Sequence, residues 1–304
     1  MSTTDVITSK SELQTLLQPW VATLRQRSAN TARSYEQAVS NFLDQLPDKG
    51  PIGPEQIAAY LDSLSGLAPA TRAHHISAVK SYLRFGQRQG AVATSILDYL
   101  VRPRVTVTSF NRYLTLEELV RLIAAARELG PRAYAAVMLM AGTGVRVEEA
   151  ATTVWRDLFR DPQGRLGLRV LGKGSKERVV AIREEDVFAA LVALHGSDKL
   201  DARDTTPLLP SRLGRAYTTR GLRKLIVTAG ELAKLDKHVS PHWLRHTHGT
   251  LAALGPNGDG RGGASAFAIQ ASLGHARLET SQRYVHWARG LEETSVSSLP
   301  SFTG

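Results

Sequence analysis

The sequence predicts a mainly α-helical protein with a small antiparallel β-sheet, divided into an N-terminal helical bundle and a larger C-terminal domain. Apolar residues recur with helical spacing over residues 11–89 and again after residue 115. Residues 101–114 interrupt this periodicity, as expected of a linker between domains. Between residues 154 and 182 the period shortens to that of strands. A chain of 304 residues is long enough for two domains with separate cores.

The N-terminal domain, residues 1–100, is expected to be an all-helical bundle. Ser11 and Gln14 have the spacing of a capping box, which predicts where the first helix begins. Pro54 suits the first turn of a helix, and Gly90 suits the residue that ends one. The later helices of the bundle are expected over about 31–46, 54–64 and 69–89.

The C-terminal domain, residues 115–304, is expected to begin with a helix, because Thr115 and Glu118 form a second capping box. The glycine-rich segment 255–263 is expected to be a flexible loop. The turn signal at 161–164 precedes two strand candidates that flank a glycine-punctuated hairpin. The remaining expected elements are a helix over 133–141, strands over 168–171 and 178–182, and a helix over 219–230.

The positive charge is concentrated in the C-terminal two-thirds of the chain. Residues 1–100 carry a net charge of +1 and residues 101–304 a net charge of +9. A basic domain attracts polyanions, of which nucleic acid is the commonest. The absence of cysteine excludes disulfides, thiolate zinc sites and a cysteine nucleophile. The sequence has neither a run of ~20 apolar residues nor the apolar core of a signal peptide, which predicts a soluble cytoplasmic protein without a membrane partner.

Two arginines lie in contexts that suit them to bind an anion. Arg245 lies three residues after His242, so both share a face near the start of a helix that Ser240 is expected to cap. Arg146 follows a glycine turn at the start of another helix, where Glu149 is placed to orient its guanidinium. Each pair alone is more typical of a solvated helix face than of an anion site.

Two further motifs place reactive groups in turns and at helix starts. Lys173 lies between two glycines of the hairpin turn, where an ammonium can reach a DNA backbone oxygen. His275 follows a helix-ending glycine, and Thr280 is expected to cap the next helix, with Tyr284 about one turn in. Alone, a turn lysine is more often a solubilising residue and a tyrosine more often a half-buried core residue.

In combination these motifs resemble the tyrosine recombinase (phage integrase-like) family in the order, local context and approximate spacing of Arg146, Lys173, His242, Arg245, His275 and Tyr284. Four motifs match closely: Gly-Thr-Gly-Val-Arg-x-x-Glu, Leu-Gly-Lys-Gly-x-Lys-x-Arg, His-x-Leu-Arg-His-Thr, and Leu-Gly-His with a tyrosine nine residues later. The resemblance covers residues 113–290. It extends more loosely to Thr31-x-x-x-Tyr35 and Pro69-Ala70-Thr71, which look like the SAM-like core-binding domain of that family.

The resemblance implies a site-specific recombinase that cleaves and rejoins DNA through a 3′-phosphotyrosyl intermediate, without metal, ATP or other cofactor. Tyr284 is then the nucleophile, and the surrounding cations are expected to activate its phenol. Arg146 and Arg245 are expected to neutralise the phosphate oxygens. Lys173 matches the family's general acid for the leaving 5′ oxygen. His242 and His275 are expected to donate hydrogen bonds and to assist proton transfer.

The resemblance also implies that the partner is double-stranded DNA with a specific recombination site, bound by a homotetramer on two duplexes in the cytoplasm at the nucleoid. An accessory DNA-bending or directionality protein is a further expected partner. The Gly255–Gly263 stretch looks like an insertion relative to the family. The residues expected to contact DNA are Arg102, Arg104, Lys176, Arg178, Arg220, Arg223 and Lys224.

Three other functions remain open on the sequence alone. The first is a metallohydrolase, because His242 and His246 have the spacing of helical zinc ligands. No clear third ligand stands out, however, and Trp243 occupies the place of the usual catalytic glutamate. A non-catalytic DNA-binding protein of the same fold is the second. The third is DNA relaxation of the type IB topoisomerase kind, which would use the same residues.

Overall fold

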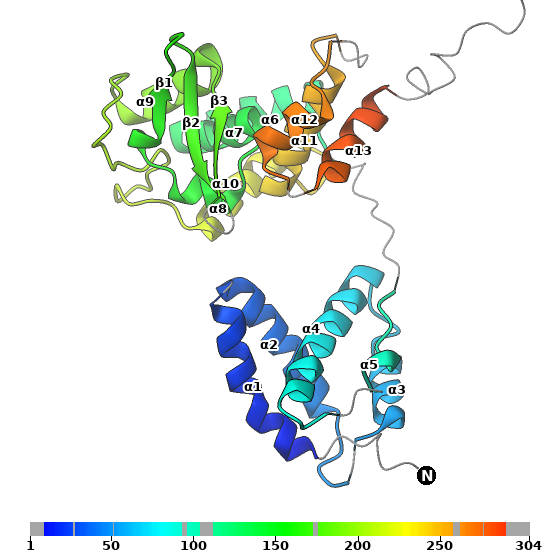
Figure 1. Ribbon diagram of the computed structural model, residues 1–304. Helices are drawn as coiled ribbons and strands as arrows, with labels where there is room; N and C mark the ends of the chain where they lie inside the picture. The colour runs from blue at the N-terminus through cyan, green and yellow to red at the C-terminus, as the bar shows by residue number, and fades with distance from the viewer. Residues whose placement is uncertain are drawn as a thin grey trace, which may run out of the picture. The chain divides into compact units, whose positions relative to one another are not determined.

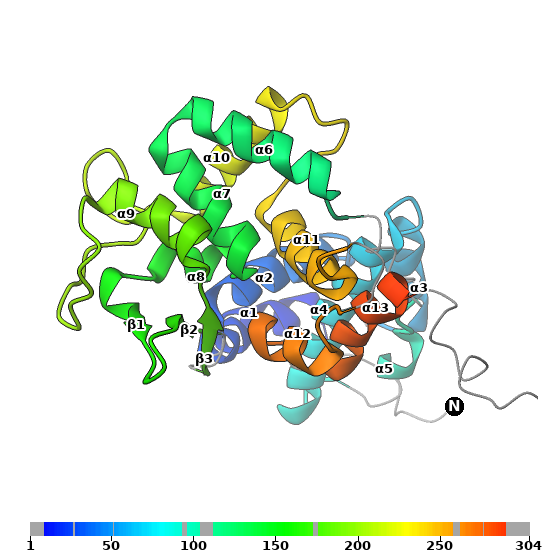
Figure 2. The same cartoon turned by 90° about the horizontal axis from the view of Figure 1, so that it is seen from above.

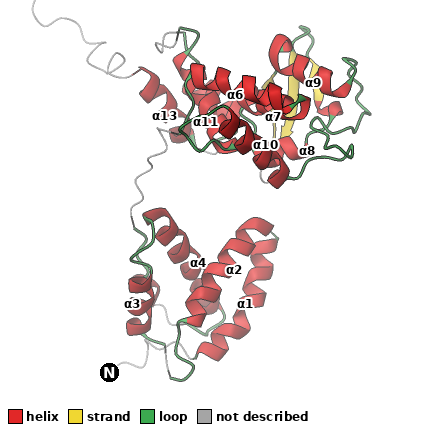
Figure 3. Cartoon of the chain, turned by 180° about the vertical axis from the view of Figure 1, so that it is seen from behind, coloured by secondary structure: helices red, strands yellow, loops and turns green. Residues whose placement is uncertain are grey.

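The computed structural model describes residues 9–26, 28–50, 52–92, 96–103, 112–172, 176–257, 262–275 and 277–289. The chain divides into two compact units, Met1–Val107 and Thr108–Gly304, each with its own hydrophobic core. Both units are mainly helical, and a small three-stranded sheet belongs to the second (Figure 3). This architecture confirms the predicted fold class.

The N-terminal unit is a helical bundle (Figure 1). Its core contains several aromatic side chains. The rings of Trp20 and Tyr82 meet edge to face with their centres 5.2 Å apart, and those of Phe42 and Tyr60 do the same at 4.9 Å. Such edge-to-face pairs add to the stabilisation that burial of the rings already provides. The helices of this unit are α1 (Lys10–Arg25), α2 (Ala29–Asp44), α3 (Pro54–Ser63), α4 (Pro69–Arg88) and α5 (Ile96–Tyr99).

The start of α1 was predicted two residues too late. The cap is Ser9 rather than Ser11, because the Ser9 hydroxyl accepts the Glu12 N–H and also bonds the Glu12 carboxylate at 3.0 Å. The stretch contains two serines with alternative capping spacings, and tertiary packing of the first turn selects the earlier one. The starts of α3 and α4 at Pro54 and Pro69 are as predicted.

The C-terminal unit is a helical domain with the sheet at one end (Figure 1). The Thr115 and Glu118 capping box is present as predicted. The helices are α6 (Leu116–Leu129), α7 (Pro131–Thr143), α8 (Val147–Thr152), α9 (Ala189–His195), α10 (Thr219–Leu232), α11 (Pro241–Leu254), α12 (Ala266–Leu273) and α13 (Leu278–Arg289), with a 3₁₀ turn at Trp155–Asp157 and a π-helical turn at Glu184–Phe188.

The sheet is antiparallel in the order β1-β2-β3, with β1 at Leu158–Arg160, β2 at Leu166–Leu171 and β3 at Glu177–Ala181. Leu168 pairs with Leu158 on one side and with Val180 on the other. Strands β2 and β3 correspond to the two predicted strands. Strand β1 was missed because a run of only three residues shows too little alternation to be recognised.

Helix α7 is the central element of the C-terminal core. Most of its side chains are buried, and it packs against α6, α9, α10 and α11. Helices α11, α12 and α13 pack against one another, and α11 connects this group to α7 (Figures 1 and 2). The end of α7 is therefore held rigidly beside α11 and α12. Among the helices that the structure describes, none combines the length and apolar character needed to cross a membrane.

Candidate active site

A glycine turn at the end of α7 delivers Arg146 to the site. Gly144 has φ +65°, a conformation that side chains disfavour. A Cβ there would also lie 2.4 Å from Leu273 and 2.9 Å from His248, so the close approach of α11 and α12 requires glycine as well. The turn leaves Arg146 at the N-cap of α8, one residue before the first turn where the sequence placed it.

Glu149 is a buried carboxylate that holds two arginines. It accepts hydrogen bonds from the backbone N–H of Arg146 at 2.7 Å and from the Arg146 guanidinium at 2.8 Å. Arg178 donates to both carboxylate oxygens, at 2.9 and 2.8 Å. Burial by itself would raise the pKa of Glu149, but the hydrogen bonds and charges of Arg178 and Arg146 lower it to about 2. The carboxylate is therefore charged throughout the neutral range.

Arg178 was expected to contact DNA, and in the structure its side chain is mainly engaged within the protein. Its side chain is 12% exposed, and its N–H groups bond Glu149 and the Ser272 carbonyl oxygen, the latter at 2.9 Å. A guanidinium engaged in this way supports the arginine cluster from within the protein. Alternation along a strand does not reveal such a partner, because Glu149 lies on a separate helix.

Arg245 is buried at the centre of the site. Its Nη1 donates to the Gly144 carbonyl oxygen at 2.7 Å, and its Nη2 donates to that of Leu273. Arg146 Nη2 similarly donates to the Gly274 carbonyl oxygen at 3.2 Å, so the end of α12 holds both arginines. Burial, with a smaller contribution from the Arg146 charge, lowers the pKa of Arg245 to about 10. Each guanidinium has more N–H groups than these contacts use, which leaves donors for a ligand.

A cavity of about 300 Å³ opens beside these arginines. Arg146, His242 and Arg245 line it, together with residues from α8 and α10. On its rim Arg223 forms an exposed ion pair with Glu148 at 3.1 Å. Burial and the nearby arginine charges lower the pKa of His242. Cationic and neutral hydrogen-bond donors around a cavity of this size suit an anion such as a phosphodiester.

Tyr284 lies on α13, which packs against α11 and α12. The helix begins at Leu278, so Thr280 lies inside it, and the prediction that Thr280 caps it is wrong. The Tyr284 ring is 8% exposed and stacks on His275 with the ring centres 6.1 Å apart. It rests against Gly249, where a Cβ would come within 3.0 Å of the ring. The ring is thus seated on a glycine of α11.

The Tyr284 hydroxyl is connected to the cavity through a third histidine, His246. The hydroxyl is 2.7 Å from His246 Nδ1, and His246 Nε2 is 2.9 Å from His242 Nε2. Burial raises the pKa of Tyr284, and the positive charge of Arg245 only partly opposes this. The Arg245 charge therefore acts in the expected direction, toward the phenolate, but burial has the larger effect.

His246 was considered from the sequence only as a zinc ligand, and its contact with the tyrosine was missed. The four-residue spacing of His242 and His246 shows that they share a helix face, but not which element faces them. Within the described part of the chain, no group of three or more metal-ligating side chains is found.

His275 occupies the position after Gly274, which ends α12 with φ +63°, as the sequence predicts. Its Nδ1 lies 2.8 Å from the hydroxyl of the buried Ser281, which fixes the orientation of the ring. Burial and then the Arg245 charge lower the pKa of His275 to about 4, so the ring is neutral at physiological pH. Ser240 stands at the N-cap of α11 but makes no side-chain cap hydrogen bond.

Several predicted site residues lie elsewhere or outside the described ranges. Lys173 and Arg104 fall outside the described residues, as do residues 258–261 of the expected insertion. Lys176, Arg220 and Lys224 are exposed, the last two on α10.

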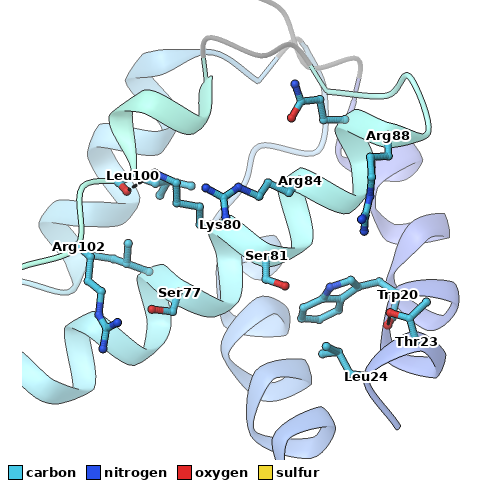
Figure 4. A pocket seen from close by; sticks show the side chains of 12 residues that line it. Trp20, Thr23, Leu24, Ser77, Lys80, Ser81, Arg84, Arg88, Leu100 and Arg102 are labelled. Carbon is cyan, nitrogen blue, oxygen red and sulfur yellow. Dashed lines mark hydrogen bonds between the residues drawn. The ribbon is translucent and has the colours of Figure 1, made fainter. Parts of the chain in front are cut away.

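A basic cleft in the N-terminal unit was largely missed. It has a volume of about 720 Å³, and Figure 4 shows Lys80, Arg84 and Arg88 along its α4 side, with Arg102 nearby. Lys80 donates to the Leu100 carbonyl oxygen at 3.2 Å. No carboxylate is among the described residues that line it. The four-residue spacing of the three α4 cations was a usable signal, because it places them on one helix face.

Comparison with known proteins identifies the class of this protein. Residues 112–290 match the phage integrase family, and residues 18–90 match the N-terminal SAM-like domain of phage integrases. The chain therefore belongs to the phage integrase family and is a tyrosine recombinase, an enzyme that breaks and rejoins DNA strands in site-specific recombination.

Named recombinases and a solved structure are similar to most of this chain. Tyrosine recombinase XerC of Xanthomonas campestris pv. campestris is 31% identical over 287 residues, covering 89% of this chain and 83% of the relative. XerC of Myxococcus xanthus is 33% identical over 256 residues, covering 80% and 81%. The fold is also similar to that of the lambda integrase chain in the structure of a lambda integrase dimer bound to a COC′ core site. The TM-score is 0.70 at 19% sequence identity, and the match covers 92% of this chain and 97% of that chain.

Proposed function

We propose that the Tyr284 hydroxyl attacks a DNA phosphodiester bound between Arg146 and Arg245. One observation carries this assignment. A continuous hydrogen-bonded chain runs from the Tyr284 hydroxyl through His246 to His242, and His242 lines the cavity beside both arginines. The nucleophile and the anion-binding groups are therefore parts of one cluster.

The arrangement suits the charge that develops during the attack. The transfer passes through a trigonal bipyramidal arrangement with extra negative charge on the non-bridging oxygens. Arg146 is fixed by Glu149, and Arg245 is fixed by the Gly144 and Leu273 carbonyls, so both can donate without reorganisation. With its Nδ1 bonded to Ser281, His275 has its Nε2 available for a phosphate oxygen.

Cleavage forms the bond between Tyr284 Oη and phosphorus and breaks the bond to the 5′ oxygen of the DNA. We assign protonation of that leaving oxygen to Lys173. The covalent 3′-phosphotyrosyl link conserves the free energy of the ester, so strands are rejoined without ATP. Rejoining to the 5′ end of a different partner is recombination. The matched relatives are named recombinases, which favours strand exchange over simple relaxation.

The proposed partner is double-stranded DNA with a specific site, met at the nucleoid in the cytoplasm. Solved neighbours of the same fold include a lambda integrase tetramer bound to a Holliday junction, and we propose the same assembly on two duplexes here. Arg220, Arg223 and Lys224 of α10, Lys176 of the hairpin and the α4 cations are the proposed backbone contacts, since exposed cations suit phosphates. The first three are exposed residues of one helix.

A nicked suicide substrate tests the assignment. The wild-type protein should become covalently joined to the DNA strand, and Tyr284→Phe should form no adduct while binding the same duplex. A covalent adduct that persists in Tyr284→Phe would move the nucleophile to another residue. The readout is the slower-migrating protein–DNA band in a denaturing gel.

A further inference from the structure

We propose that His246 is a catalytic residue that carries the phenolic proton from Tyr284 to His242. This inference rests on the proposed role of Tyr284 as the nucleophile. His246 is the hydrogen-bond partner of the Tyr284 hydroxyl, at 2.7 Å from Nδ1. Its other ring nitrogen, Nε2, lies 2.9 Å from His242 Nε2. Both distances are those of made hydrogen bonds.

A transfer requires one particular set of tautomers, and both contacts of His246 are compatible with it. A neutral imidazole has one N–H, so Nδ1 accepts the tyrosine hydroxyl only when the hydrogen is on Nε2. That Nε2–H then donates to His242 Nε2, which requires His242 to carry its own hydrogen on Nδ1. The hydroxyl, His246 and His242 thus form a directed series of donors that ends at the phosphate cavity.

The proton transfer balances without a change in the charge of His246. As the bond between Tyr284 Oη and phosphorus forms, the phenolic proton passes to His246 Nδ1. The hydrogen on His246 Nε2 passes to His242 Nε2, which becomes an imidazolium. His246 ends neutral, as the other tautomer. Rejoining reverses each transfer and returns the proton to the tyrosine.

Burial of His246 and the charges around it explain why it should relay the proton rather than keep it. Burial, with smaller contributions from His242, Arg245 and Arg112, lowers the pKa of His246 to about 4. A stable cation there is therefore disfavoured. His242 lines the cavity, where a bound phosphate supplies negative charge for the imidazolium.

The other histidine near the tyrosine is placed for a different task. The His275 ring lies nearly parallel to the Tyr284 ring, with an angle of 16° between the planes and 6.1 Å between the ring centres, and its Nδ1 bonds Ser281. The Tyr284 hydroxyl has its hydrogen bond with His246 Nδ1, at 2.7 Å. The contact with the reacting oxygen thus belongs to His246.

The first test separates proton relay from mere positioning. His246→Asn keeps a polar atom close to the place of Nδ1, and so keeps a partner for the hydroxyl, but it loses the link to His242. Single-turnover cleavage of the nicked substrate should be about 100-fold slower, with unchanged affinity for the duplex and an unchanged unfolding temperature. Cleavage at the wild-type rate would overturn the relay and leave His246 a positioning residue.

A sulfur substitution in the substrate identifies which proton His246 moves. A 5′-bridging phosphorothiolate gives a leaving thiolate that needs no protonation. It should restore cleavage by Lys173→Ala, the matched control, and leave His246→Asn slow. Restoration of His246→Asn to the wild-type rate on this substrate would place His246 at the leaving group and overturn the proposal.

A third variant guards against a folding artefact. His246→Ala leaves space for a free imidazole, and added imidazole should restore cleavage in a concentration-dependent manner. Failure of imidazole to restore any cleavage in folded, DNA-binding His246→Ala would count against the relay. If instead the wild-type protein forms no adduct through Tyr284, the proposed nucleophile fails, which these variants distinguish from failure of the relay alone.

Discussion

Glu149 is the residue on which the geometry of the arginine cluster depends. It is 5% exposed and bonds both Arg146 and Arg178. Glu149→Gln keeps the shape but removes the charge that compensates the two guanidiniums. We expect slower strand cleavage and a lower free energy of unfolding at neutral pH, because breaking a buried pair leaves uncompensated charge.

The same carboxylate predicts a pH dependence of stability. The pKa of Glu149 is about 2 in the folded protein, against an ordinary value of 4.5. The charged form therefore contributes stability fully above pH 4.5, and this contribution, roughly 3 kcal/mol, is lost as pH falls toward 2. Denaturant unfolding of wild type and Glu149→Gln should show a stability difference that shrinks over this interval. An equal difference at pH 7 and pH 3 would contradict the prediction.

At the residue scale, local spacing revealed some partners and concealed others. The contact between Arg146 and Glu149 was expected from a three-residue spacing and is present at 2.8 Å. Arg178 and His246 have their partners on other elements, so no local pattern indicated them. Burial is also a property of the packed fold, so the burial that raises the pKa of Tyr284 has no local signal in the sequence.

Helix α4 gives a prediction at the scale of the element. Lys80, Arg84 and Arg88 line one cleft from one helix face (Figure 4). If each neutralises a DNA phosphate, replacing one by alanine should reduce the slope of log affinity against log salt by about 0.9 and weaken binding to all sequences alike. Lys49→Ala, exposed but outside the cleft, should leave the slope unchanged. Binding titrations at several salt concentrations provide the measurement, and an equal effect of both kinds of variant would contradict it.

The elements themselves were predictable where a local signal marks them. Pro54, Pro69 and the Thr115 capping box begin three helices as expected. Prediction failed where two signals competed, as at Ser9 and Ser11, because a helix can begin at either serine until packing decides. Strand β1 depends on pairing with β2 and has no sufficient pattern of its own.

At the scale of the whole molecule, the two units have separate cores. A large truncation in one core should therefore destabilise that unit and leave the other unchanged. Phe42→Ala in the first unit and Trp155→Ala in the second each remove a fully buried ring, at roughly 3–5 kcal/mol. Calorimetry of the full chain should resolve two transitions, each moved by one variant. A single transition shifted by both variants would show that the units unfold together.

The division into a small bundle and a larger basic domain was visible in the periodicity and the charge distribution. What the sequence does not specify at this scale is which helices meet. The site brings together two parts of the chain, the end of α7 with the start of α8 and the group α11, α12 and α13. The contact of Arg245 with Gly144 spans 101 residues, and that of Arg146 with Gly274 spans 128. Such contacts arise from packing around α7 and have no local signature.

The arginine cluster contains more positive than negative charge before any ligand arrives. Arg146, Arg178 and Arg245 face a single carboxylate, Glu149, which leaves an excess of two positive charges. A phosphodiester carries one negative charge, and its pentacoordinate form carries two. If the cluster binds the scissile phosphate as proposed, it complements the pentacoordinate form better than the intact phosphodiester. Under the proposed function, the mutual repulsion of these cations, which the folded protein sustains, would be reduced most in the transition state of strand cleavage.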